Sequence, residues 1–260
     1  MKEIFAIFQK ELKTSYYSLI AYIVIGLFTA IAGYFFFSQL SYFVEMAFRE
    51  MMMAQQYRMQ PRPMNVNLML VRPFFGILAT ISLFFLPIIT MRLYSEEKRL
   101  GTVELLYTTP ITPTQIIIGK FLSGVALYIV LLIPSMLFQV LLFVYGSPEF
   151  WPIFSGYLGL ILMGSAFIAL GLFISTTTEN QIISAIGGFA LLLILWVIGF
   201  SASFAGSTLG SVLSYVSIIN HFEDFSQGVI DTSHVAYYLL LISVGIYFST
   251  KMIESVKWRA

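Results

Sequence analysis

Six long apolar stretches limit the folds available to this chain more than any other feature. An α-helix needs about 20 consecutive, mostly apolar residues to cross the hydrocarbon core of a bilayer. Charged residues make up only 10% of the chain, whereas soluble domains carry about 25%. The sequence therefore predicts an all-α, polytopic membrane protein that forms a single transmembrane domain over residues 1–260. The six predicted transmembrane helices are 18–40, 72–91, 116–145, 153–175, 182–205 and 235–253.

The distribution of basic residues predicts the orientation of these spans. Cytoplasmic loops of membrane proteins carry an excess of lysine and arginine. With a cytoplasmic N-terminus, every lysine falls on the inside and only four of the 14 basic residues, all arginines, fall on the outside. An even number of spans then places both termini in the cytoplasm. We expect a multi-pass protein of the bacterial cytoplasmic (inner) membrane.

The first fifteen residues, 1–15, are predicted to form an amphipathic helix. Apolar residues recur there at helical spacing, and charged residues occupy the rest of the helical wheel. Such a helix lies in the membrane interface, with its basic face toward anionic lipid. A polar lead-in to the first span is the alternative interpretation. The candidate residues of this interfacial helix are Ile4, Phe5, Phe8, Lys10 and Glu11.

The segment between the second and third spans, residues 92–120, is far more polar than its surroundings and lies on the predicted inside. Ser95 is a favourable N-cap residue. The acids Glu96 and Glu97 follow it, where the positive end of a helix dipole stabilises negative charge. Gly101 then permits a turn. The pattern predicts a short cytoplasmic helix in a compact hairpin.

We expect this hairpin to dock on a cytoplasmic partner, because it is both compact and amphipathic. A second short helix is predicted to start at Thr102 and to end before Pro110, since proline removes a backbone donor. A solvated connection between two spans is the alternative interpretation. The candidate docking residues are Arg92, Ser95, Glu96, Glu97, Lys98, Gly101, Thr102, Glu104, Leu105, Leu106 and Pro110.

Two further loops are predicted from local patterns. Residues 42–71, on the outside, are rich in methionine, which is a soft copper(I) ligand and also a flexible apolar filler. No histidine or cysteine accompanies these methionines, so we favour packing over copper binding. On the inside, residues 178–180 are expected to cap the fifth span at its N-terminus.

The last outside segment, residues 206–233, is half apolar and half polar. We expect one or two short helices that dip into the outer leaflet without crossing it. A metal or acid–base site built from its histidines and acids is the alternative, although their spacing matches no familiar zinc helix. The residues of the predicted polar mouth are His221, Phe225, Gly228 and Asp231.

Several catalytic signatures are absent from the sequence. It contains no G-x-x-x-x-G-K-[ST] loop, no H-E-x-x-H motif and no G-x-S-x-G elbow, which are common phosphate-binding, zinc and nucleophile motifs. It also contains no cysteine. The predicted spans hold few ionisable residues, whereas secondary transporters and proton relays need them. We therefore predict that this chain is not an enzyme and that its driving energy comes from a partner.

Residues 92–106 (RLYSEEKRLGTVELL), together with Pro110 and the Gly119–Phe121 stretch, resemble the signature of ABC-2 type exporter permeases. Residues 156–181 and 221–231 resemble the branch of these permeases that is associated with gliding motility. The resemblance covers nearly the whole chain. It implies an ABC-2 exporter fold with six spans in each permease.

The resemblance also implies the partners. They are two copies of a cytoplasmic ABC ATPase subunit, a second permease subunit that is identical or paralogous, and membrane lipid, with no nucleic acid. ATP and Mg would bind to the ATPase, and no cofactor would bind to this chain. In such exporters the interfacial helix and the coupling helix after the second span contact the ATPase. Matched onto this chain, these are residues 3–13 and about 95–107.

The implied function is export or extrusion of a substrate, driven by ATP hydrolysis on the partner. In the mechanism that we expect, ATPase closure pushes the segment 96–106. Glu97 and Glu104 would then be surface anchors, and Leu105 and Leu106 an apolar plug. Two alternatives remain: a non-transporting membrane anchor of a motility or secretion assembly, and a membrane-embedded enzyme with a His/Asp site at its outer face.

Overall fold

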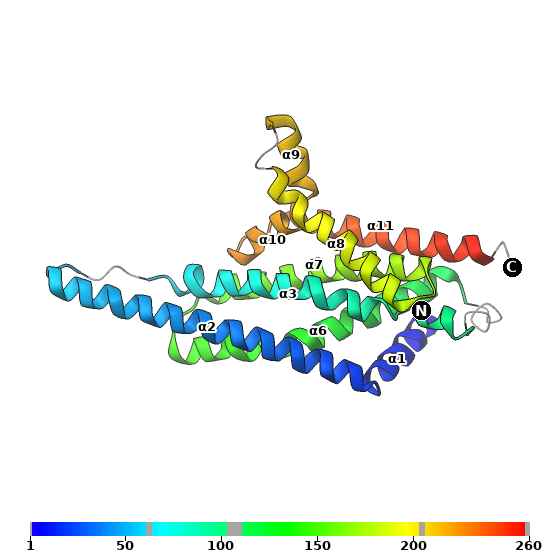
Figure 1. The fold of residues 1–260 in the computed structure, drawn as a ribbon, viewed down its shortest axis with the longest axis horizontal. Helices are drawn as coiled ribbons and strands as arrows, with labels where there is room; N and C mark the ends of the chain where they lie inside the picture. Colours follow the sequence, from blue (N-terminus) through cyan, green and yellow to red (C-terminus); the bar gives the residue numbers. More distant parts are fainter. Residues whose placement is uncertain (1, 61–63, 103–110, 203–205, 258–260) are drawn as a thin grey trace.

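The computed structural model describes residues 2–60, 64–102, 111–202 and 206–257. Within these ranges all regular secondary structure is helical (Figure 1), which confirms the predicted all-α class. The elements are α1 (Lys2–Tyr16), α2 (Leu19–Tyr57), the π-helix η1 (Asn67–Val71), α3 (Arg72–Thr90), α4 (Ser95–Arg99), α6 (Pro113–Tyr145), α7 (Phe150–Thr177), α8 (Gln181–Ala202), α9 (Ser207–Val216), α10 (Ile218–Ser226) and α11 (Thr232–Lys257).

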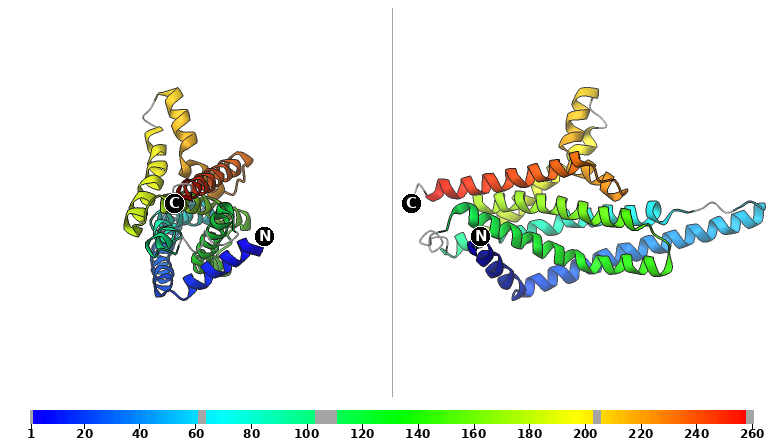
Figure 2. Two further views of the ribbon diagram at one scale, coloured as in Figure 1. Left: turned by 90° about the vertical axis from the view of Figure 1, so that its right-hand side faces the viewer. Right: turned by 180° about the vertical axis from the view of Figure 1, so that it is seen from behind.

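Six helices in the described part of the chain are long and apolar enough to cross a membrane, which confirms the predicted number of spans. They are α2, α3, α6, α7, α8 and α11. Successive spans run in opposite directions, so α1 and the C-terminal end of α11 lie at the same end of the bundle (Figures 1 and 2). We call this the α1 end of the bundle.

Helix α7 is the centre of the bundle. Of its most apolar 18-residue window, 72% is buried, against 17% for α8. Small residues on α7 let neighbouring helices approach closely: a Cβ atom on Gly164 would lie 2.0 Å from Tyr128 of α6, and one on Gly171 would lie 2.3 Å from Thr90 of α3. Close approach at small residues is the usual way in which membrane helices associate. The apolar surface of α8 is left to lipid or to another protein.

The first predicted span, 18–40, is the beginning of a much longer helix. Helix α2 continues to Tyr57, and its 39 residues make it about 58 Å long, which exceeds the roughly 30 Å of a hydrocarbon core. The part of the methionine-rich segment up to Tyr57 therefore forms a helical extension of the first span. Met51, Met52 and Met53 all have exposed side chains on it.

Polar caps set the limits of several spans. The side chain of Thr112 accepts a hydrogen bond from the Gln115 backbone N–H, and the Gln115 side chain accepts one from the backbone N–H of Thr112, which forms a capping box at the start of α6. Asn180 caps α8 as expected, because its Oδ1 accepts the backbone N–H of Ile182 at 2.9 Å. The segment 206–233 contains two short helices, α9 and α10, as predicted; that they dip into the outer leaflet stays a prediction.

The contact between α11 and α7 provides a test of this packing. A Cβ atom on Gly245 would lie 2.7 Å from the backbone carbonyl carbon of Ala169, and backbone cannot move aside as a flexible side chain can. We expect Gly245→Ala to destabilise the fold by about 1–3 kcal/mol through overpacking, although alanine favours helix more than glycine does. The measurement is the thermal unfolding midpoint of the purified protein in detergent.

The matched control is Gly26→Ala on α2, where an added Cβ atom meets nothing within 4 Å. That variant should be neutral or slightly more stable. An unchanged midpoint for Gly245→Ala would show that the α7–α11 contact is looser than described.

Candidate functional site

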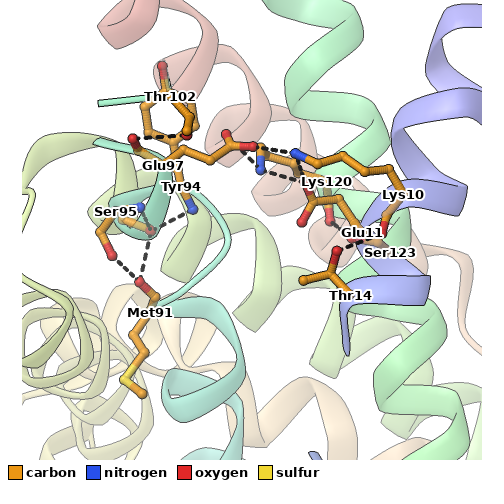
Figure 3. Close-up of polar contacts among 11 residues, drawn as sticks. Lys10, Glu11, Thr14, Met91, Tyr94, Ser95, Glu97, Thr102, Lys120 and Ser123 are labelled. Carbon is orange, nitrogen blue, oxygen red and sulfur yellow. Dashed lines mark hydrogen bonds and ion pairs between the residues drawn. The ribbon is translucent and has the colours of Figure 1, made fainter. Parts of the chain in front are cut away.

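Four charged side chains from three helices meet at the α1 end of the bundle (Figure 3). Lys10 and Glu11 come from α1, Glu97 from α4 and Lys120 from α6. Lys10 Nζ lies 2.8 Å from Glu97 Oε1, and Lys120 Nζ lies 2.9 Å from both Glu97 Oε2 and Glu11 Oε1. A longer contact of 3.4 Å joins Lys10 to Glu11 and closes the ring. We call these residues the four-charge cluster.

Lys120 is the buried member of the four-charge cluster. Its side chain is 2% exposed, and those of Glu97 and Glu11 are 12% and 15% exposed. A buried ammonium group is costly unless opposite charges surround it, and two carboxylates do so here. Partial burial alone would lower the pKa of Lys10, but the hydrogen bond and the charge of Glu97 raise it above its ordinary value. The four-charge cluster therefore pairs two lysines with two carboxylates.

The backbone packs tightly beside the four-charge cluster. A Cβ atom on Gly119 would lie 2.8 Å from Ile7 Cγ2 and 3.1 Å from the Ile4 carbonyl oxygen, so α1 lies directly on α6. Ile7 is the buried residue of α1. Ile4, Phe5 and Phe8 were the apolar residues predicted for α1, and Ile7, which makes the packing contact, was not among them.

Helix α4 is held by α7 rather than by its own cap, which corrects one prediction. Ser95 is the first helical residue and not the N-cap; its hydroxyl donates back to the Met91 carbonyl. The cap comes from Ser175, whose Oγ accepts the backbone N–H groups of Tyr94 and Ser95 at 3.1 and 3.0 Å. These donors would otherwise be unsatisfied at the helix start. A tertiary contact thus fixes where α4 begins.

The other end of this connection is held by Lys98. Its Nζ donates a 2.7 Å hydrogen bond to the Thr176 carbonyl in the last turn of α7, where the helix dipole favours a cation. Gly101 follows in a left-handed conformation, with φ at 68°, which is the turn expected there. Thr102 Oγ1 donates to the Glu97 carbonyl at 3.3 Å.

The predicted docking residues do not form one surface: some are buried, and two line a cavity. Glu97 is buried in the four-charge cluster, so the prediction that it is a surface anchor was wrong. Lys10 and Lys120 already occupy the two oxygens of its carboxylate. Arg92 and Glu96 line a cavity between α1 and the bundle. Glu104, Leu105, Leu106 and Pro110 lie outside the described residues.

A second polar group lies where α10 meets α11. His221 Nδ1 is 2.6 Å from His234 Nδ1, His221 Nε2 is 2.8 Å from the Tyr215 carbonyl oxygen, and His234 Nε2 is 2.7 Å from Asp224 Oδ2. The Tyr237 ring stacks on the His221 ring at a centroid distance of 3.8 Å. Both Nε2 atoms lie against oxygen atoms, to which an N–H group can donate.

The predicted outer mouth is only partly exposed. His221 and Phe225 are buried, whereas Asp231 is exposed and accepts the Ser233 backbone N–H. Gly228 has φ at 93° and ends the turn after α10. Among the described residues no group of three or more His, Asp or Glu side chains is arranged to hold a metal ion. That these four residues form a polar mouth stays a prediction.

Residues 5–251 match the ABC-2 family transporter protein family, and the chain therefore belongs to this family. It is a multi-pass membrane permease component of an ABC transporter; such components are not themselves catalytic and normally work with a cytoplasmic ABC ATPase. A comparison with curated proteins finds no significant match to this sequence.

The four-charge cluster provides a second test of the structure. Glu97→Gln removes the carboxylate that joins Lys10 to Lys120 and leaves a buried ammonium group with less compensation. Breaking a buried ion pair costs about 3–5 kcal/mol, so we expect the thermal midpoint to fall by on the order of 10 °C. Glu254→Gln is the control. It breaks the exposed Lys251–Glu254 pair and should cost less than about 1 kcal/mol. Similar losses in both variants would contradict the central role of Glu97.

The histidine pair predicts a pH dependence. Burial lowers the pKa of His221, and the nearby charge of His234 acts in the same direction, while the Tyr215 carbonyl and Asp224 oppose them. The unfolded chain, with a histidine pKa of about 6.5, then takes up the proton first. The contribution of His221 to the free energy of unfolding is therefore fully present above about pH 6.5, and it is lost as the pH falls below that value.

We expect the thermal midpoint to drop between about pH 7.5 and about pH 5.5. The drop should be smaller in His221→Phe, which keeps an aromatic ring against Tyr237 but cannot take up a proton. Equal drops in both proteins would show that other groups carry the acid sensitivity.

Proposed function

We propose that this chain is the permease subunit of an ATP-driven ABC-2 exporter, and that ATP hydrolysis on a separate cytoplasmic ATPase drives extrusion of its substrate. The observation that supports this best is the four-charge cluster. It joins α1, α4 and α6, and the first two are the elements that the family resemblance assigns to ATPase contact. Two segments that are far apart in the sequence are thus connected directly by ion pairs.

The contacts of α4 suggest how a push at the α1 end would spread. Glu97 links α4 to α1 and α6, while Ser175 and Lys98 link it to the end of α7. Coupling between distant sites needs an element whose position both sites bias. Displacement of α4 would therefore move α1, α6 and α7 together. In this proposal ATP and Mg bind to the ATPase, and this chain holds no cofactor.

Exposed apolar surface supports a paired permease. Most of α2 and α8 is unburied: 22% and 17% of their most apolar windows are covered. On α8 the exposed residues include Ile186, Ile194 and Phe200. A second permease subunit, identical or paralogous, would cover part of this surface, and membrane lipid the rest. Two ATPase copies would match two permeases.

The arrangement of the ends supports the proposed orientation. α1 and the C-terminal part of α11 share one end of the bundle (Figure 1), and this end carries the lysine-rich segments. We propose that it faces the cytoplasm across the bacterial inner membrane. Membership of the gliding-motility branch is part of the proposal, and rests on the resemblance of residues 156–181 and 221–231.

The coupling role predicts the effect of charge reversal. Glu104→Lys should reduce the stimulation of ATPase activity by the permease at least about tenfold. The introduced lysine would repel the basic residues that we expect on the ATPase. The measurement is ATP hydrolysis by the co-expressed complex reconstituted in lipid. Membrane insertion should be unchanged.

The matched control is Glu149→Lys, an exposed acid between α6 and α7, at the opposite end of these helices. It should leave the stimulation intact. Normal stimulation in Glu104→Lys would contradict the coupling role. Complex formation without any ATPase stimulation in the unaltered protein would instead favour a membrane anchor.

A further inference from the structure

A cavity of about 240 Å³ lies at the α1 end, enclosed by α1, α2, the segment from the end of α3 into α4, and α6. Its lining changes character along the bundle. Towards the α1 end it is polar, with Ser15 and Ser18 at the α1–α2 bend and Arg92 after α3. Farther along the same helices it is apolar, with Val24 of α2 and Leu131 of α6. The cavity is therefore polar at the α1 end of the bundle and apolar farther along it.

Two charges at the polar part of this cavity have no partner in the described part of the chain. The Nε atom of Arg92 is buried without a hydrogen bond, and neither the Arg92 guanidinium nor the Glu96 carboxylate takes part in an ion pair among these residues. The neighbours Glu97 and Lys98 are both paired. Leaving a buried polar group unsatisfied costs free energy, and a polar occupant of the cavity would relieve that cost.

We propose that this cavity binds a zwitterionic phospholipid from the leaflet at the α1 end. Arg92 would hold the phosphate, since guanidinium groups pair with phosphate through charge-assisted hydrogen bonds. Glu96 would take the headgroup amine. One acyl chain would lie along the apolar wall beside Val24 and Leu131.

The combination of groups selects this ligand class over simpler ones. A free phosphate would leave the apolar wall empty and Glu96 uncompensated. A purely anionic lipid would satisfy Arg92 but place further negative charge beside Glu96, and Glu11 lines the same cavity. A neutral diacylglycerol would leave the buried Nε atom of Arg92 without a partner. A lipid with a phosphate, an amine and an acyl chain would match all three features: the Arg92 guanidinium, the Glu96 carboxylate and the apolar wall.

The site also adjoins the four-charge cluster, because Glu11 belongs to both. A bound lipid would fill the space between the α1–α2 bend and the bundle, and would brace α1 in its position. The inference goes beyond the proposed function and does not depend on the ATPase partner or on the exported substrate.

Short-chain phosphatidylethanolamine, titrated into the purified full chain in uncharged detergent, tests the proposal by native mass spectrometry. We expect saturable binding that Arg92→Gln weakens by about tenfold or more. Ala21→Phe should weaken it similarly, because Ala21 lines the cavity and the larger ring would fill it. The matched controls are Arg99→Gln and Ala30→Phe, which alter exposed residues of α4 and α2. Both should bind as the unaltered chain does.

Headgroup competition tests the zwitterionic assignment separately. Short-chain phosphatidylglycerol should bind more weakly than phosphatidylethanolamine, and Glu96→Gln should remove that difference. Equal binding by all four variants of the first experiment would overturn the site. Equal binding of diacylglycerol, or displacement of the lipid by inorganic phosphate alone, would overturn the proposed ligand class.

Discussion

The buried ammonium group of Lys120 is the constraint on which the α1 end of this permease depends. Lys120 lies in α6, a helix that is otherwise apolar enough to span a membrane. Its burial is compensated because Glu11 and Glu97 form ion pairs with it from two other helices. Removing an ion from water costs several kcal/mol unless its partners are well placed. The need to neutralise one lysine therefore holds α1, α4 and α6 in a single arrangement, and the close contact at Gly119 makes it compact.

Helix α7 plays the complementary part in the apolar interior. It is the most buried of the candidate spans, and its last turn presents Ser175 and the Thr176 carbonyl to the connection after α3. The five-residue helix α4 is too short to be stable alone. Its position is set by these contacts with α7 and by the lysines around Glu97. The candidate coupling element is thus defined by the bundle that it is proposed to move.

Local sequence chemistry predicted much of this structure and failed at identifiable places. Asn180 caps α8 and Gly101 makes a turn as expected, because both effects act within a few residues. Ser95 was assigned a capping role by the same reasoning, yet a serine on a different helix caps α4. Glu97 was assigned to the surface as an anchor for the ATPase in the expected coupling mechanism. The lysine within the third apolar stretch was the signal that such an acid had to be buried.

The sequence by itself determined the class of protein: apolar runs of spanning length, with charges gathered between them, leave only a helical membrane bundle, since backbone groups in lipid must be satisfied within each helix. Tertiary structure alone decided which charges meet. Lys10 and Glu97 are separated by 87 positions, and Glu11 and Lys120 by 109. Ion pairing depends on distance in space, which helix packing sets and the spacing of residues along the chain does not. The pairing of His221 with His234, and the placement of Arg92 and Glu96 around one cavity, have the same origin.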